Sequence, residues 1–269
     1  MKLEGKQGQV LRWSVAGAII GVLLSLTLFA PAAWLARAIE QSSGGRLLLA
    51  DARGSVWSGS ALLVLTGGQG SLDGSALPGR IEWHTRLSGA ALALNLSQPC
   101  CLNGVVSLTL QPGIGSAKLT LTSTHRDWVA RWPAAWLAGL GTPWNTLQPG
   151  GSVRLSTQQF SLERTLGRWR QTGQVAFDFM NLTSRVSTVE PLGSYRFSVT
   201  GDATRPGVSL LKLSTQEGAL MLSGEGTLDG GNTHFRGVAK AAPGRETALD
   251  NLLNIIGRRQ GAQSAISIG

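Results

Sequence analysis

The chain has 269 residues, which is enough for one large domain or two small ones. Only 14% of the residues are charged, where roughly 25% is usual, and 42% are hydrophobic, so the composition excludes a disordered chain and a coiled coil. The 36 glycines follow no Gly-X-Y period, which excludes collagen, and the net charge of +9 raises nucleic acid and anionic lipid as candidate partners.

The first predicted element is a membrane anchor. Residues 13–36 form 24 consecutive positions without a charge. At about 1.5 Å per residue, a helix of this length crosses a hydrocarbon core of roughly 30 Å. Lys2, Lys6 and Arg12 precede the run and only Glu4 opposes them, so the positive-inside rule predicts a cytoplasmic segment 1–12 and an exported segment 37–269.

A cleaved signal peptide is the alternative to this anchor. Ala30-Pro31-Ala32 and Ala36-Arg37-Ala38 both fit a small-x-small cleavage pattern. The apolar run 15–33 is longer than the roughly 7–15 residues of a signal-peptide core, which favours the uncleaved anchor. Under either interpretation residues 37–269 lie outside the cytoplasm, so we expect no nucleic-acid partner.

Short segments of alternating apolar and polar residues recur along the exported part, which is typical of strands with one apolar and one polar face. We predict a mainly β fold in which a large, mostly antiparallel, curved or folded-over sheet forms two halves, about 45–125 and 150–240. With only two good helices to cover some twelve strands, a hydrophobic groove is one expected outcome. The segments are centred on Leu94, Leu108, Leu121, Phe177, Phe197, Leu213 and Leu222.

A tryptophan-rich stretch, about 126–149, separates the two halves and predicts a central helical insertion. Trp128, Trp132 and Trp136 are spaced by four residues, as on one face of a helix, and Asp127 is a candidate N-cap. Two interpretations remain open. The indoles either pack this helix onto the edge of the sheet or form a docking patch for a membrane surface or a protein partner.

A C-terminal helix is predicted over about 247–257. Thr247 and Asp250 resemble a capping box, and Gly257 is expected at the left-handed position after the helix. The apolar stripe is a second interaction candidate, although its plainer role is to plug one end of the sheet, and the tail 260–269 shows little pattern that would form a core. The stripe consists of Leu249, Leu252, Leu253 and Ile256.

The sequence carries no strong catalytic motif, so we expect no enzyme, no catalytic residues and no cofactor. His84, His125 and His234 lie far apart and none is followed by a matching acid at a metal-ligand spacing, so we expect no metal site.

Cys100 and Cys101 are the two cysteines of the chain. In an oxidising compartment they can form a disulfide with each other, pair with another chain or stay reduced, and the sequence leaves these alternatives open. A dithiol redox role is disfavoured because they lack the C-x-x-C spacing.

Three stretches resemble the N protein family of the bacterial type II secretion system. They are A-R-G-S-V-W-S-G at 52–59, W-P-A-A-W-L at 132–137 continuing to Pro149-Gly150-Gly151, and L-D-N-L-L-N-I-I-G-R-R at 249–259. The overall layout, with one membrane helix before a β-rich exported domain, is similar too.

The resemblance implies a non-enzymatic, single-pass subunit of the bacterial inner membrane, with residues 37–269 in the periplasm. Such a subunit takes part in export of folded periplasmic proteins across the outer membrane. The implied partners are other inner-membrane and periplasmic subunits, membrane lipid and secreted cargo. A weaker similarity, carried by 220–230, L-M-L-S-G-E-G-T-L-D-G, is to AsmA-like envelope proteins, which implies the alternative of a periplasmic lipid-binding or lipid-transfer protein with a hydrophobic β groove.

Overall fold

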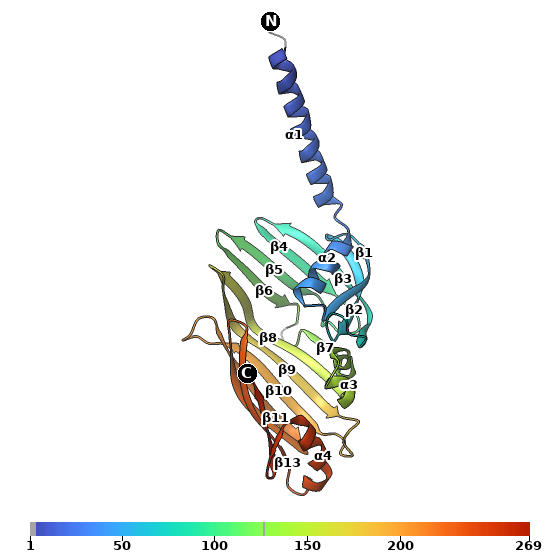
Figure 1. Cartoon of the computed structure of the whole chain (residues 1–269), viewed down its shortest axis with the longest axis vertical. Helices are drawn as coiled ribbons and strands as arrows, with labels where there is room; N and C mark the ends of the chain where they lie inside the picture. Colours follow the sequence, from blue (N-terminus) through green and yellow to red (C-terminus); the bar gives the residue numbers. More distant parts are fainter. Residues whose placement is uncertain (1–3, 126) are drawn as a thin grey trace.

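The computed structural model describes residues 4–125 and 127–269, and within them the predicted mainly β fold is confirmed. The strands form a single antiparallel sheet of 15 strands in the described residues, and this sheet curves along its whole length (Figure 1). Sequence neighbours pair almost throughout, from β1 at one edge to β14 at the other.

The strands are β1 (Leu47–Gly54), β2 (Ser58–Thr66), β3 (Gly74–Ser88), β4 (Ala91–Ser97), β5 (Val106–Gly113), β6 (Ser116–Ser123), β7 (Ala130–Pro133), β8 (Gly150–Thr165), β9 (Arg168–Thr183), β10 (Gly193–Gly201), β11 (Val208–Gly218), β12 (Leu220–Asp229), β13 (Asn232–Ala241), β14 (Arg258–Gln260) and β15 (Gln263–Ile268). The helices are α1 (Glu4–Leu28), α2 (Ala32–Ser42), the 3-10 helix η1 (Ala134–Leu140), α3 (Trp144–Leu147) and α4 (Glu246–Ile256).

The two predicted halves join through β8, the long strand at the centre of the sheet. Residues 161–165 of β8 pair with β6, and residues 152–155 pair with the short strand β7. β8 bends between these two parts, because its pairing with β9 slips between Gln158 and Ser161 and Gln159 has a positive φ of 48°. The single sheet therefore passes from one half to the other without a break.

The uncharged run that we expect to form the anchor does not form one continuous helix. The uncharged run 13–36 is divided between α1 and α2, with a break at Phe29-Ala30-Pro31. Pro31 causes the break because it disfavours a helical conformation at Ala30 and lacks the N–H that a continued helix would need. The carbonyl oxygen of Ala30, which would bond within its own helix if the helix continued, instead accepts a hydrogen bond of 2.9 Å from Val56 N in the turn between β1 and β2. Among the helices of the described residues, none combines the length and the apolar character needed to cross a bilayer. Residues 1–3 of the predicted cytoplasmic segment lie outside the described part.

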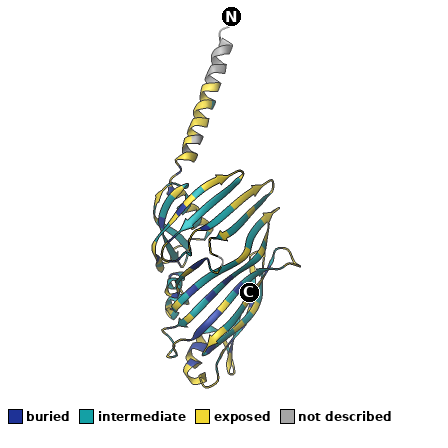
Figure 2. Cartoon of the chain, turned by 180° about the vertical axis from the view of Figure 1, so that it is seen from behind, coloured by how far each residue is buried: buried dark blue, intermediate teal, exposed yellow. Residues whose placement is uncertain are grey.

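Helices α2 and α4 pack on the sheet in the first and second halves, and η1 packs on β2, β3 and β8 at the join between them. In the first half α2 packs on β1 and β2, where Ala32, Ala61 and Trp83 form a buried cluster. In the second half α4 packs on β13, β14 and β15. Figure 2 shows the residue burial of the sheet, where buried positions concentrate in the part near α4. The core is therefore thin, and much of the apolar face is shielded from water only where these helices pack on it.

The C-terminal helix is found within a residue of its predicted bounds, but its ends differ from the prediction. Arg245 is the N-cap and makes no side-chain capping bond, so Thr247 and Asp250 form no capping box. Gly257 has an extended φ of −170° because the chain continues directly into β14. Asp250 instead pairs with Arg259 over 2.6 Å.

The tail also differs from the prediction, since β15 pairs with β13 along its whole length. Ser264 in this strand is fully buried and donates a hydrogen bond to Leu253 O. The tail therefore holds α4 against the sheet, because β15 pairs with β13 and Ser264 bonds to α4. The residue pattern of the tail did not indicate this pairing.

Candidate functional site

An apolar pocket of about 380 Å³ lies on the covered face of the second half of the sheet. Its wall is formed by strands β9 to β12 together with α3 and α4. This volume falls within the roughly 300–1,000 Å³ of small-molecule sites. We define the apolar pocket by its lining residues, which are Trp144, Leu147, Pro149, Phe179, Leu182, Thr183, Ser184, Leu192, Tyr195, Phe197, Leu213, Leu220, Leu222, Leu252 and Ile256.

The alternating pattern of the strands explains why this wall is apolar. Phe197 pairs with Phe177 on β9 and with Leu213 on β11, so apolar side chains from neighbouring strands align in rows. Farther along the sheet, Gly224 leaves space for the ring of Phe235, since a Cβ at Gly224 would lie 2.4 Å from that ring. Phe235 meets Phe197 edge to face at 6.4 Å between centroids.

The polar groups of the apolar pocket bond within the protein. The Tyr195 hydroxyl donates to Leu220 O over 2.9 Å, and Ser184 Oγ donates to Leu147 O over 2.8 Å. Burial raises the pKa of Tyr195 well above its usual range, so this hydroxyl stays neutral. The wall therefore suits an apolar group and offers no charged nucleophile.

A cation lies beside the pocket on the connection that follows β9. Arg185 Nη1 donates to Gln148 Oε1 over 2.8 Å, and the Arg185 backbone N–H donates to Leu147 O. Leu147, Pro149 and Ser184, the sequence neighbours of Gln148 and Arg185, all line the pocket. This exposed guanidinium is the charged group that an amphiphile seated in the pocket would meet.

The predicted stripe of α4 is mostly core. Leu249, Leu252 and Leu253 are 0%, 3% and 1% exposed, and they pack with Leu192, Tyr195 and Leu220. Ile256 is half-buried and lines the pocket together with Leu252. The structure thus turns this stripe toward the sheet, where it closes one side of the apolar pocket.

The three predicted tryptophans do not form one helical stripe. Trp128 lies in the loop before β7, Trp132 lies in β7, and Trp136 lies in η1. Pro133 ends β7 and precedes η1, so the spacing of four residues does not correspond to helical turns. Position 126, the first residue of the predicted insertion, lies outside the described residues.

Two of the three indoles, those of Trp132 and Trp136, nevertheless pack together at the join between the two halves. Trp132 and Trp136 meet edge to face at 5.8 Å, and Trp136 Nε1 donates to Ser75 O on β3 over 2.9 Å. All three side chains are half-buried. This cluster fastens η1 and β7 to the first half of the sheet.

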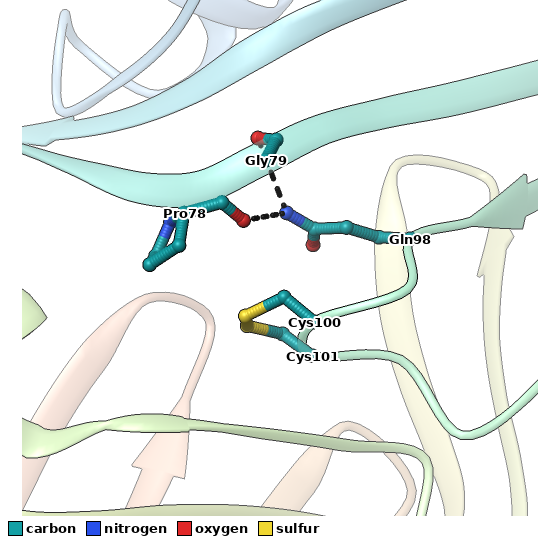
Figure 3. The surroundings of a disulfide bond; sticks show 5 residues. All are labelled: Pro78, Gly79, Gln98, Cys100 and Cys101. Carbon is teal, nitrogen blue, oxygen red and sulfur yellow. Dashed lines mark hydrogen bonds between the residues drawn. A yellow bond between two sulfur atoms is a disulfide. The ribbon is translucent and has the colours of Figure 1, made fainter.

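Cys100 and Cys101 are joined by a disulfide in the connection between β4 and β5. Figure 3 shows this pair beside Gln98, whose Nε2 donates to Pro78 O over 3.0 Å. On its other side, Arg131 N on β7 donates to Cys101 O over 2.8 Å. The connection is therefore hydrogen-bonded to β3 on one side and to β7 on the other.

The opposite face of the sheet carries a charged cluster around Asp178. Asp178 on β9 receives Arg196 Nε over 2.6 Å and Arg154 Nη2 over 3.2 Å. Burial favours the neutral acid, but the hydrogen bonds and charges of Arg196 and Arg154 prevail and lower the pKa of Asp178. This cross-strand triplet lies on the face away from the apolar pocket.

The three histidines considered as metal ligands lie in different parts of the fold. His84 is in β3, His125 follows β6 and His234 is in β13. Within the described residues, no cluster of three or more His, Cys, Asp or Glu side chains could hold a metal ion.

Comparison with known proteins identifies the family. The sequence model of type II secretion system protein N matches residues 45–268. The chain belongs to this family. No curated protein and no solved structure matches it. The matched range begins just before β1 and ends at β15, so it covers the whole sheet together with η1, α3 and α4. The chain is therefore a component of the type II secretion system.

The residues that sequence reasoning missed are the pocket lining on β9 to β12. Phe179, Leu213 and Leu222 were predicted to face one side of a sheet, and that alternation was the available signal. Which part of the apolar face stays uncovered depends on where α3 and α4 lie, and the pattern of the strands carries no information on that.

Proposed function

We propose that the chain is a non-enzymatic, single-pass inner-membrane subunit whose sheet lies in the periplasm and contacts other secretion subunits. The observation that carries this is the family match over 45–268. The uncharged run 13–36 and the basic residues before it support an inserted α1 with a cytoplasmic N-terminus. The exposed side chains along α1 agree, since Ile19, Ile20 and Val22 are each more than half exposed and bury nothing against the sheet.

Contact is the mechanism that this architecture supports. The membrane helix would meet neighbouring helices in the bilayer, and the sheet would meet periplasmic subunits or secreted cargo. The join between the halves, with Trp128, Trp132 and Trp136 half-buried, is the candidate surface for a protein partner, because tryptophan is enriched at the centre of such interfaces.

The test is native mass spectrometry of the full chain, gently extracted from its own membranes. We expect secretion subunits in stoichiometric complex with it. Loss of those subunits in a Trp128→Ala and Trp136→Ala variant that retains its sheet by circular dichroism would assign the contact to the join. Extraction with no secretion subunit, from cells that assemble the complete machine, would contradict the proposal.

A second function, lipid binding, is favoured by the apolar pocket. A filled core between α4 and the sheet would have left no space, whereas about 380 Å³ remains beside Arg185. The ligand class would be an amphiphile with one acyl chain in the pocket and an anionic group at the guanidinium. The same mass spectra distinguish the two functions, since a retained phospholipid without secretion subunits would favour lipid binding over machine assembly.

A further inference from the structure

In an antiparallel sheet every second turn lies on the same side of the sheet, where the strands reverse direction. Here 'edge' means one of these two sides and not an outermost strand. The turns 88–91, 113–116 and 165–168 join β3 to β4, β5 to β6 and β8 to β9. We define these three turns as the tip edge. The opposite edge carries the longer connections, including η1 and α3, so the two edges differ in kind (Figure 1).

The end of α1 lies at the same edge as these turns. The turn between β1 and β2 is the next one along, and it holds the chain that leaves α1. Trp57 Nε1 in this turn donates to Thr27 O over 2.8 Å, and Pro31 pairs with Ser55. In Figure 1 the turns after β3 and β5 lie close to the level at which α1 ends, and the turn after β10 lies much farther away.

Each hairpin of the tip edge exposes a large apolar side chain, which lies in the turn itself at Ile114 and Leu166 and in β3, one residue before the turn, at Leu87. Leu87, Ile114 and Leu166 are 69%, 108% and 87% exposed. Ile114 stands between Gly113 and Gly115, so no neighbouring side chain on the turn shields it. Turns usually carry polar residues, and three successive apolar tips on one edge leave this apolar surface in water unless a partner covers it.

The charge beside these tips is mainly basic. The acidic residue beside these three turns is Glu163, and it is half-buried. Within the described residues, none of the basic side chains that flank these three turns forms a salt bridge. The Arg164 guanidinium lies over the Trp169 ring, 5.5 Å from its centroid. The exposed basic residues are Arg86, Lys118, Arg164, Arg168 and Arg170.

We infer that the tip edge docks on the surface of a bilayer that contains anionic phospholipid. Basic side chains that surround apolar tips match the boundary between headgroups and acyl chains, and tryptophan favours the same depth. The tips are separate protrusions along an edge and not a continuous patch, which suits a broad, deformable surface better than one protein interface. This inference rests on the proposed function, because the tip edge lies near the bilayer surface only if α1 is inserted in the membrane.

Nitroxide labels on the full chain in vesicles test this inference. Single cysteines replace Ile114, Leu166, Leu72 and Ile20 in turn, and the disulfide between Cys100 and Cys101 keeps those two thiols from reacting. Leu72 is the matched control, because it is 104% exposed but lies in the connection between β2 and β3 at the opposite edge. Accessibility to oxygen and to a water-soluble nickel chelate is measured by power saturation.

In phosphatidylethanolamine and phosphatidylglycerol vesicles, we expect the label at 114 to be several-fold less accessible to the nickel chelate than the label at 72. The label at 166 should be intermediate. Lys118→Glu with Arg86→Glu, in a chain with an unchanged circular dichroism spectrum, should restore the accessibility at 114. Equal accessibility at 114 and 72 would overturn the inference.

The label at 20 separates this inference from the proposed anchor. Protection at 20 with full chelate access at 114 would leave α1 inserted and remove the docking edge. Protection at 114 with access at 20 would keep the docking edge and contradict insertion of α1. Protection at 72 as well as at 114 would indicate general burial against vesicles or other chains, and would also overturn the inference.

Discussion

The indole N–H of Trp57 donates a hydrogen bond of 2.8 Å to the carbonyl oxygen of Thr27. This bond connects the last turns of α1 to the turn between β1 and β2, across 30 residues of sequence. Together with the bond from Val56 N to Ala30 O, it orients α1 relative to the sheet. It also satisfies one of the carbonyl groups that the end of a helix leaves without a partner.

Trp57→Phe should therefore loosen α1 without unfolding the sheet. The substitution keeps an aromatic ring but removes the donor, at a cost on the order of 1 kcal/mol. Pulsed electron resonance between labels at positions 20 and 72 should show a broader distance distribution in the variant. Trp34→Phe is the control, since in the described residues the Trp34 indole donates no hydrogen bond, and an equal broadening there would contradict the role of Trp57.

Filling the apolar pocket should abolish acyl-chain binding. Leu213→Trp places an indole among the lining side chains, so the affinity for the fluorescent fatty acid cis-parinaric acid should fall about tenfold or more. Leu210→Trp is the matched control because Leu210 lies on the same strand, is 41% exposed and faces away from the pocket. Equal affinity in the two variants would place the fatty acid elsewhere.

Tyr195 provides a pH test because it is the one tyrosine of the sequence. Its pKa is raised in the folded state by burial, so its contribution to stability is complete below about pH 10, the usual tyrosine pKa, and is lost above it. Tyrosinate absorbance should appear only as the chain unfolds. In denaturant the same group should titrate near pH 10. Titration of the native chain near pH 10 would show that the hydroxyl is not buried.

Asp178→Asn should destabilise the centre of the sheet at neutral pH. The change removes the charge that Arg196 and Arg154 face, and should lower the free energy of unfolding by about 1–3 kcal/mol. Because its folded pKa is lowered, the contribution of Asp178 is complete above about pH 4 and is lost as pH falls through that lowered pKa.

Denaturant unfolding at several pH values measures this effect. The difference between the native chain and Asp178→Asn should shrink as pH falls below about 4. Asp229→Asn is the control, since Asp229 is exposed at the end of β12 and forms no salt bridge within the described residues. A constant difference down to low pH would indicate that the variant acts through packing and not through charge.

Strands were the most predictable part of the fold. The segments around Leu94, Leu108 and Phe197 each become one strand, because alternation of apolar and polar residues is a local property that survives in any antiparallel sheet. The C-terminal helix was predictable for the same kind of reason, since Leu249, Leu252 and Leu253 repeat at helical spacing.

The tryptophan stretch shows where local patterns fail. A spacing of four residues fits a helix, yet Trp132 pairs in β7 with Val153, a residue 21 positions away. That pairing partner was not visible from residues 126–149 alone. In the same way β15 forms because β13 offers a free edge, and no local signal in 263–268 reports that edge.

The sequence by itself determined the class of the fold, the apolar run before it and the family, because these depend on composition, periodicity and residue order. Only the tertiary structure decided where the apolar face stays uncovered, that α4 turns its leucines inward, and that Leu87, Ile114 and Leu166 share one edge with the end of α1. The physical reason is that each of these depends on contacts between segments distant in the chain, whose energies no local pattern contains.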